Sequence, residues 1–279
     1  MTDKSAFIEK ELKKCLLNIK CDTEPQLFSA MLYALMSGGK RVRPTLMLLS
    51  ADMLDVPSEK VKPYAIALEC IHSYSLIHDD LPAMDNADTR RGVPSVHKVY
   101  GEGVAILAGD ALLNLAYEIL FAAAEEGGAF VKAAACLAYA AGSCGMVGGQ
   151  AEEMHLADMY KNLKADEVME RLLQMYSKKT GALIRAAIII PCILSENNEK
   201  MAIIEEIAEN IGLIFQLADD IIDFKEGDDG LTFVSVDGGK EAKRLIEELD
   251  AKVATALDTF GESGAALKEY AAALSRRTV

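Results

Sequence analysis

The chain has 279 residues, of which 51% are hydrophobic, 26% are charged and only 6% are aromatic. This balance is typical of a globular protein that buries a substantial core. The formal net charge of −14 argues against nucleic acid as a partner, because phosphate backbones are bound mainly by a surplus of lysine and arginine.

The first twenty residues mix acids and lysines along an amphipathic pattern, without the apolar stretch and cleavage site of a signal peptide. The cysteines form no C-x-x-C pair, and most lie in apolar stretches. We interpret all of them as reduced, buried thiols: Cys15, Cys21, Cys70, Cys136, Cys144 and Cys192. Together these features predict a cytoplasmic location.

Apolar residues recur at three- and four-residue spacing through most of the chain, which predicts roughly eight to eleven helices. Glycine- and proline-containing breaks separate them, at Gly38-Gly39, Val56-Pro57, Arg91 to Pro94, Gly127-Gly128, Gly148-Gly149 and Gly227 to Gly230. The sequence contains no linker and no internal repeat. We therefore predict an all-α fold with a single helical domain over residues 1–279. In such a bundle, polar residues that face inward can build a ligand site.

The first motif in chain order is Gly38-Gly39-Lys40-Arg41-Val42-Arg43-Pro44. Its glycines allow backbone amides to approach an anion, and the start of the following helix adds a favourable dipole. The motif predicts an anion-binding turn. The alternative is a basic turn on the protein surface.

The next motif is SYSLIHDDLPAMDNADTRRG, in which Asp79, Asp80 and Asp85 precede Arg90 and Arg91. Carboxylates beside arginines indicate a metal ion together with phosphate. Mg²⁺ takes few protein carboxylates and completes its coordination with water and phosphate oxygens, while arginine binds phosphate in a bidentate manner. The alternative interpretation is a solvated acidic helix end.

Helical geometry sets a condition on this motif. On a regular helix, Asp85 would lie roughly 240° around the axis from Asp79, so the two side chains would not face one ligand. Pro82 lies between them and removes a backbone hydrogen bond. The helix is therefore predicted to kink or end near Pro82, which returns Asp85 towards Asp79.

Two segments of the sequence are apolar enough to be considered as membrane spans. The window from Val104 to Ala124 contains Asp110, Asn114 and Glu118, and the window from Ala182 to Leu194 contains Arg185 and Pro191. We predict that neither spans a membrane. The β-branched run at residues 188–190 continues a helical pattern, and it is predicted to be buried helix.

A second acidic cluster follows in the segment FQLADDIID. Its polar members share one helical face because they are spaced by three, four or seven residues: Gln216, Asp219, Asp220 and Asp223. Clustered carboxylates on one face repel each other without a cation. Taken alone this motif is common on surfaces, but two such clusters far apart in the chain indicate a shared metal site.

With these residues in place, the chain resembles the trans-prenyl diphosphate synthases, especially bacterial farnesyl diphosphate synthases. Seven segments occur in the order of that family: GGKRVRP, ECIHSYSLIHDDLPAMD, TRRG, ILAGDALL, GMVGGQ, KKTGALI and FQLADDIID. The resemblance implies a helical bundle of the isoprenoid synthase type with a central active-site cavity, condensation of an allylic diphosphate with isopentenyl diphosphate, and a homodimer.

The resemblance also implies roles for individual residues. Mg²⁺ would be held by Asp79, Asp80, Asp85, Asp219, Asp220 and Asp223. The diphosphates would be bound by Lys40, Arg43, His72, Arg90 and Arg91. Lys179, Thr180 and Gln216 would line the allylic site, where their oxygens could face carbocation charge. For His72 alone, a hydrogen-bonded helical histidine would be the plainer interpretation.

Product length is set in this family by bulk just before the first acidic cluster, where this chain has Tyr74 and Ser75. The bulky Tyr74 favours farnesyl diphosphate over geranylgeranyl diphosphate. Without the family context, a tyrosine that packs between helices explains this position equally well.

The chain departs from the family pattern after Asp223. Relatives carry a longer loop with glycine and lysine followed by a Lys-x-Thr element, whereas this chain has Gly230 before Thr232, and Lys225 is a poor substitute. Glu153 replaces a common aspartate. If the short loop is genuine, a catalytically weak partner subunit is an alternative function. A geranylgeranyl synthase, a terpene cyclase and a helical scaffold are the others, and the intact motifs argue against the last.

Overall fold

The computed structural model describes residues 3–156, 160, 163–224, 231–237 and 239–276. Within these residues the chain is almost entirely helical, and its sheet content is one antiparallel two-stranded ribbon. The all-α prediction is confirmed. The structure forms more helices than the periodicity predicted, because short elements such as α5 (Val96–Tyr100) and α13 (Phe233–Asp237) have too few residues to show a period.

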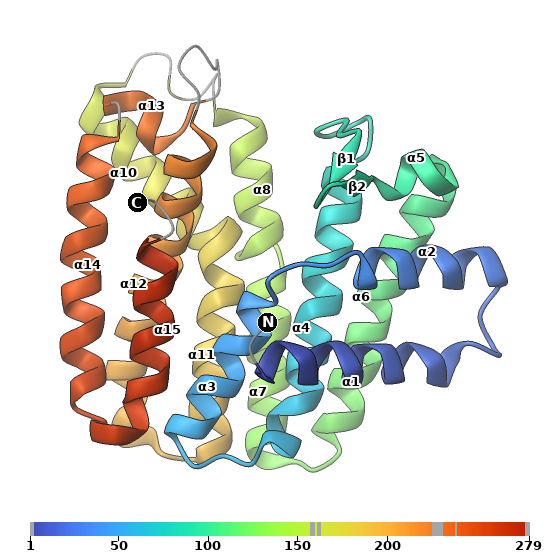
Figure 1. The fold of residues 1–279 in the computed structure, drawn as a ribbon, viewed down its shortest axis with the longest axis horizontal. Coiled ribbons are helices and arrows are strands. Elements are labelled where there is room, and N and C mark those ends of the chain that lie inside the picture. The colour runs from blue at the N-terminus through green and yellow to red at the C-terminus, as the bar shows by residue number, and fades with distance from the viewer. Residues whose placement is uncertain (1–2, 157–159, 161–162, 225–230, 238, 277–279) are drawn as a thin grey trace. The chain divides into compact units, whose positions relative to one another are not determined.

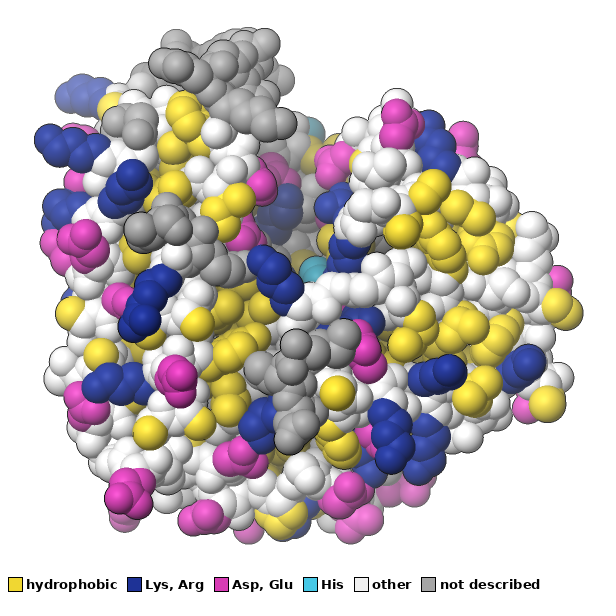
Figure 2. All heavy atoms as spheres, viewed as in Figure 1, with side chains coloured by type: hydrophobic (Ala, Val, Ile, Leu, Met, Phe, Trp, Pro, Cys, Tyr) yellow, Lys and Arg dark blue, Asp and Glu magenta, His cyan; other side chains and the backbone are white. Residues whose placement is uncertain are grey.

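The contacts group the chain into two compact units that interleave along the sequence. The first contains residues 1–48 and 58–134, and the second contains residues 49–57 and 135–279. Helices α3 (Val42–Met53) and α7 (Gly128–Ala141) contribute residues to both. The single domain stays a prediction. On the face shown in Figure 2, acidic and basic side chains are interspersed over both units.

The first unit is built around the long helix α4 (Ser58–Asp79), which packs along α6 (Glu102–Ala124) (Figure 1). Helices α1 (Asp3–Ile19) and α2 (Pro25–Met36) also contact α4. Gly109 permits the close approach of α6, since a Cβ there would lie 2.1 Å from the His78 Nε2 atom. Most of α4 is buried, which explains why its sequence shows little amphipathic pattern. The ribbon of β1 (Thr89–Arg90) and β2 (Val93–Pro94) follows the end of α4.

The second unit is centred on α12 (Met201–Asp223), which packs against α11 (Ala182–Ser195) and α14 (Lys240–Asp258). Helix α8 (Met146–Met154) contacts α10 (Ala165–Tyr176) and the π-helix η1 (Ser177–Gly181). The remaining elements are the 3₁₀ turns η2 (Asn198–Lys200) and η3 (Gly261–Gly264) and the helix α15 (Ala265–Ser275).

Two local predictions can be compared directly with the structure. Residues 188–190 are buried within α11, so the predicted buried helix is confirmed. The cysteine prediction is correct only in part. No thiol is in a disulfide, but only Cys70 and Cys192 are buried, whereas Cys15 and Cys136 are half-buried and Cys21 and Cys144 are exposed. The two exposed cysteines lie at turns beside helix ends, and their immediate neighbours in the sequence are polar residues or glycine, which do not draw the thiol into the core.

Two stretches, Glu102–Ala124 and Gly128–Met154, are long and apolar enough to cross a membrane by length and composition alone. In the 18-residue windows that qualify, 39% and 33% of the residues are buried. The second stretch is interrupted between α7, which ends at Ala141, and α8, which begins at Met146. Buried core helices pass the same test, so the absence of a membrane span stays a prediction.

Helices α6 and α7 carry large apolar side chains on the surface of the first unit. Leu107 is 57% exposed, Phe121 is 72% exposed and Val131 is 50% exposed. Large apolar side chains that stay exposed on helices can mark a surface that another protein covers. We propose that a second copy of this chain covers it, as the predicted homodimer requires.

Replacing Phe121 with glutamate tests this surface. We expect the wild-type chain to sediment as a dimer and Phe121→Glu to sediment as a monomer, because a carboxylate cannot be buried there without a partner. Leu17→Glu is the matched control, since Leu17 is 49% exposed on α1 and should leave the dimer intact. A wild-type monomer, or a Phe121→Glu dimer, would contradict the proposal.

Candidate active site

The first acidic cluster lies where α4 ends. The helix ends at Asp79, three residues before Pro82, as the sequence predicted. The chain then turns back, and the Asp85 amide donates a hydrogen bond to the Asp79 carbonyl oxygen at 2.8 Å. The backbone of Asp85 therefore returns to the end of α4. Asp79 is half-buried and Asp85 is exposed.

Asp80 is more deeply buried than the preceding Asp79. Its side chain is buried, with 2% exposure of the residue, and Oδ1 accepts hydrogen bonds from both Nε and Nη2 of Arg90. The Nε bond is 2.9 Å long. A buried carboxylate needs such a charged partner to offset its lost hydration. Asp80 therefore anchors Arg90, and its predicted role as a metal ligand stays a prediction.

The ribbon that carries Arg90 and Arg91 is fixed by contacts that the sequence motifs did not reveal. The buried Ser95 hydroxyl donates to the Ala87 carbonyl at 2.7 Å, and the Tyr33 hydroxyl donates to the Pro94 carbonyl at 2.7 Å. Arg91 Nη1 donates to the Gly38 carbonyl at 2.6 Å. These bonds hold the paired strands against the basic turn.

Gly39 is required beside Arg91. Its φ is +122°, and a Cβ there would lie 2.7 Å from the guanidinium carbon of Arg91. Only glycine combines this backbone conformation with so close an approach. The glycines of this turn were predicted to let backbone amides approach an anion. The structure adds that Gly39 leaves room for the Arg91 guanidinium.

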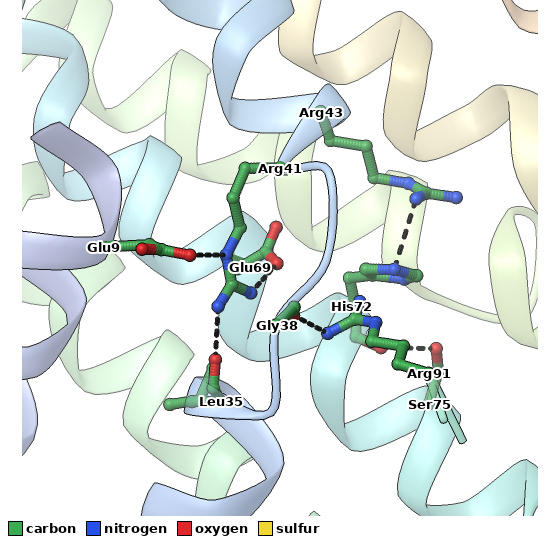
Figure 3. A network of polar contacts seen from close by, with 9 residues as sticks. All are labelled: Glu9, Leu35, Gly38, Arg41, Arg43, Glu69, His72, Ser75 and Arg91. Carbon is green, nitrogen blue, oxygen red and sulfur yellow. Dashed lines mark hydrogen bonds and ion pairs between the residues drawn. The ribbon is translucent and has the colours of Figure 1, made fainter. Parts of the chain in front are cut away.

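The basic turn divides its arginines between two tasks (Figure 3). Arg41 points inward, where its guanidinium binds Glu69 at 2.5 Å and also the Leu35 carbonyl oxygen. Arg43 instead reaches His72, with 3.3 Å between Nη1 and Nε2. Lys40 is exposed. Arg41 therefore stabilises the turn from inside the protein, whereas Arg43 lies beside His72.

His72 is held neutral by its surroundings. Burial lowers the pKa of His72 well below its usual range, and the nearby arginines lower it further, with Arg43 and Arg91 the foremost. A neutral ring can accept a hydrogen bond from the Arg43 guanidinium through Nε2. His72 is thus part of the basic cluster rather than an isolated helical histidine. Several guanidinium groups around a neutral ring form a site suited to an anion.

The second acidic cluster, like the first, contains one buried aspartate beside more exposed ones. On α12, Asp219 is half-buried and Asp223 is exposed, whereas Asp220 is 8% exposed. Oδ1 of Asp220 accepts from Gln216 Nε2 at 2.8 Å, and Oδ2 accepts from the Tyr176 hydroxyl. Burial raises the pKa of Asp220, and these hydrogen bonds oppose that shift. The acidic side chains that were predicted to share one helical face therefore differ in burial. Asp220 lies inside the second unit, whereas Asp219 and Asp223 are more exposed.

Lys179 and Thr180 lie in the π-helix η1, a conformation that often occurs at functional sites. Two glycines allow neighbouring helices to approach it. A Cβ on Gly149 would lie 2.3 Å from the Lys179 backbone nitrogen, and one on Gly212 would lie 3.0 Å from the Gly181 Cα. The Lys179 ammonium is paired with Glu153. Periodicity arguments assume a regular helix and could not have predicted this bulge.

Thr180 and Gln216 are brought together as predicted for a shared site. The Thr180 hydroxyl donates to Gln216 Oε1 at 2.5 Å. This bond joins η1 to α12, in line with the backbone contact between the two elements.

Tyr74 is buried on α4, one helical turn before His78. Their rings meet edge to face with centroids 5.8 Å apart, and burial raises the pKa of Tyr74 to about 12. The hydroxyl of Ser75 donates to the His72 carbonyl at 2.9 Å, so it is bonded to the backbone of its own helix. These contacts agree with the interpretation of Tyr74 as a packed aromatic side chain, and its role in product length stays a prediction.

The described residues offer few side chains that could hold a metal ion together. Among the residues that the structure describes, no three His, Cys, Asp or Glu side chains lie close enough to hold one. Aspartate oxygens nevertheless suit Mg²⁺, which needs only one or two protein carboxylates when phosphates complete its coordination. Lys225 and the segment Gly227 to Gly230, with its predicted loop, lie outside the described residues.

The family model and the similar proteins point to the same family. Residues 24–232 match the polyprenyl synthetase family. The chain is 38% identical to the farnesyl diphosphate synthase of Micrococcus luteus over 263 residues, which covers 89% of this chain and 88% of that protein. It is 43% identical to the geranylgeranyl diphosphate synthase of Cyanophora paradoxa over 200 residues, and the match covers 71% of this chain and 65% of that protein.

The fold is also matched by a solved structure. The crystal structure of a geranyltransferase from Legionella pneumophila matches this fold with a TM-score of 0.85 at 34% sequence identity. The match covers 99% of this chain and 98% of that chain. The predicted isoprenoid synthase fold is therefore confirmed.

Proposed function

This chain belongs to the polyprenyl synthetase family, and we propose that it condenses an allylic diphosphate, dimethylallyl or geranyl, with isopentenyl diphosphate. The observation that carries the proposal is the basic cluster of the first unit. Arg43 and Arg91 lie around the neutral His72, and this concentration of guanidinium groups supports a diphosphate site there. A terpene cyclase has no use for such a second diphosphate site.

The carboxylates that flank the anchored aspartates are suited to Mg²⁺. We propose that Asp79, Asp85, Asp219 and Asp223 hold the ions, with Asp80 and Asp220 supporting them from the protein side. Bound Mg²⁺ would neutralise the diphosphate that leaves the allylic substrate. Family membership favours such a metal-dependent reaction.

The remaining residues suggest how the reaction proceeds. Breaking the allylic C–O bond places negative charge on the diphosphate, which Arg90 would stabilise from its fixed position on the ribbon. Oxygens of Thr180, Gln216 and the Lys179 carbonyl would face the allylic cation. Lys40, Arg43 and Arg91 would orient isopentenyl diphosphate so that its double bond attacks that cation. The proton then lost would go to the departing diphosphate, and no side-chain nucleophile is needed.

We propose farnesyl diphosphate as the product, because the buried Tyr74 supplies bulk one turn before the acidic cluster. Geranylgeranyl diphosphate is the alternative, since relatives carry both names. The free thiols agree with the proposed cytoplasmic location. The weak-subunit alternative depends on the segment at residues 225–230, outside the described residues.

Asparagine variants of the proposed metal ligands test the function. With geranyl diphosphate, isopentenyl diphosphate and Mg²⁺, we expect Asp79→Asn and Asp219→Asn each to lower turnover by about 100-fold or more, because a neutral amide binds the cation poorly. The measurement is product formation followed by mass spectrometry, with thermal unfolding to confirm the fold.

The matched control is Asp55→Asn, an exposed residue with a φ of +53° that asparagine tolerates well. It should keep wild-type turnover. Wild-type rates in purified Asp79→Asn or Asp219→Asn, or a wild-type chain that forms no prenyl product, would refute the proposed function.

Tyr74→Ala tests the proposed product. We expect products longer than farnesyl, because removing the ring opens space beside α4. Chromatography of the dephosphorylated products gives the length distribution. Tyr139→Ala is the control, since Tyr139 is 62% exposed on α7 and should not affect length. An unchanged distribution in Tyr74→Ala would show that this residue does not limit the chain.

A further inference from the structure

We propose that Tyr176 is a positioning residue for prenyl transfer, whose hydroxyl joins the Asp220 carboxylate to the backbone of Phe233 and thereby orients Gln216 and Thr180. The inference rests on the proposed function and adds to it a residue outside the predicted site. Tyr176 is the last residue of α10 and directly precedes the π-helix that carries Lys179 and Thr180.

The Tyr176 hydroxyl makes two hydrogen bonds in a buried environment. It donates to Asp220 Oδ2 on α12, and it accepts from the Phe233 amide on α13 at 3.0 Å. The side chains of Tyr176 and Phe233 are both buried, so water does not replace these bonds freely. A single hydroxyl thus ties the end of α10 to two other helices.

The donors and acceptors of these hydrogen bonds are ordered, and the Asp220 carboxylate is the final acceptor. Thr180 donates to Gln216 Oε1, Gln216 donates to Asp220 Oδ1, and Tyr176 donates to Asp220 Oδ2. The bond to Asp220 fixes which end of the Gln216 amide faces Thr180. Because the Thr180 proton is then committed to Gln216, the Thr180 oxygen can present only lone pairs elsewhere.

That orientation matters for the proposed chemistry. An oxygen that presents lone pairs can stabilise an allylic cation, whereas an O–H that points at the cation opposes it. The Tyr176 hydroxyl accepts from the Phe233 amide, so its own proton is the one that it donates to Asp220 Oδ2. Tyr176 would therefore act on the reaction through Asp220 and Gln216 without touching substrate.

The variant that isolates this hydroxyl is Tyr176→Phe, which keeps the ring. We expect kcat with geranyl diphosphate to fall about tenfold while the KM for isopentenyl diphosphate changes less than about twofold. Tyr64→Phe is the matched control. It also removes a buried hydroxyl, which donates to the Phe130 carbonyl at 2.8 Å in the first unit, and it should leave kcat unchanged.

A double-mutant cycle separates positioning from plain stabilisation. In a Thr180→Val background the hydroxyl that Tyr176 orients is gone, so Tyr176→Phe should lower kcat by less than about twofold. A merely structural tyrosine would give the same tenfold loss in both backgrounds. That additive result, or an unchanged kcat in Tyr176→Phe alone, would overturn the proposal.

Amide hydrogen exchange at Phe233 supplies a readout that needs no activity. Tyr176→Phe should lower the protection of this amide about tenfold, while Tyr64→Phe should not affect it. If the wild-type chain forms no prenyl product, the proposed function fails, and the exchange result still decides the linkage. Unchanged protection at Phe233 would overturn the proposal whatever the outcome of the assays.

Discussion

The arrangement of the candidate active site depends on one buried, hydrogen-bonded aspartate in each of the pairs Asp79-Asp80 and Asp219-Asp220. Asp80 is buried against Arg90, and Asp220 is buried against Tyr176 and Gln216. A buried carboxylate is stable only when hydrogen bonds or a cation replace its water, so each anchor fixes the groups around it. The aspartates that precede the anchors, Asp79 and Asp219, are half-buried, and we propose that they bind the cation that accompanies a diphosphate.

The same principle organises the basic side chains. The chain as a whole carries a formal charge of −14, yet it gathers arginines around a neutral His72. Arg41 is paired internally with Glu69, whereas Arg43 lies beside His72. Arg90 is held by Asp80 and Arg91 by the Gly38 carbonyl. A fixed guanidinium needs little reorganisation when an anion binds, which favours both affinity and catalysis.

Several of these features could be predicted from the sequence. Pro82 correctly predicted the end of α4, the apolar pattern predicted that residues 188–190 are buried helix, and the motif order predicted the family. Each of these rests on a local rule or on the order of residues along the chain, which a single sequence contains.

Other features could not be predicted, because they depend on tertiary partners. Asp79 and Asp80 are chemically identical neighbours, and the sequence does not tell which of them pairs with Arg90 in the folded chain. Tyr176 carries no motif, and its role follows from two helices that are distant in sequence. The π-helix at Lys179 breaks the period on which helical predictions rely.

The division within each acidic pair is tested most directly by metal affinity. Mn²⁺ binding in the presence of geranyl diphosphate, followed by electron paramagnetic resonance, can be compared between Asp79→Asn and Asp80→Asn, and between Asp219→Asn and Asp220→Asn. We predict that Asp79→Asn and Asp219→Asn weaken Mn²⁺ binding about tenfold or more, whereas the anchor variants stay within about threefold of wild type. Equal losses within each pair would contradict the account.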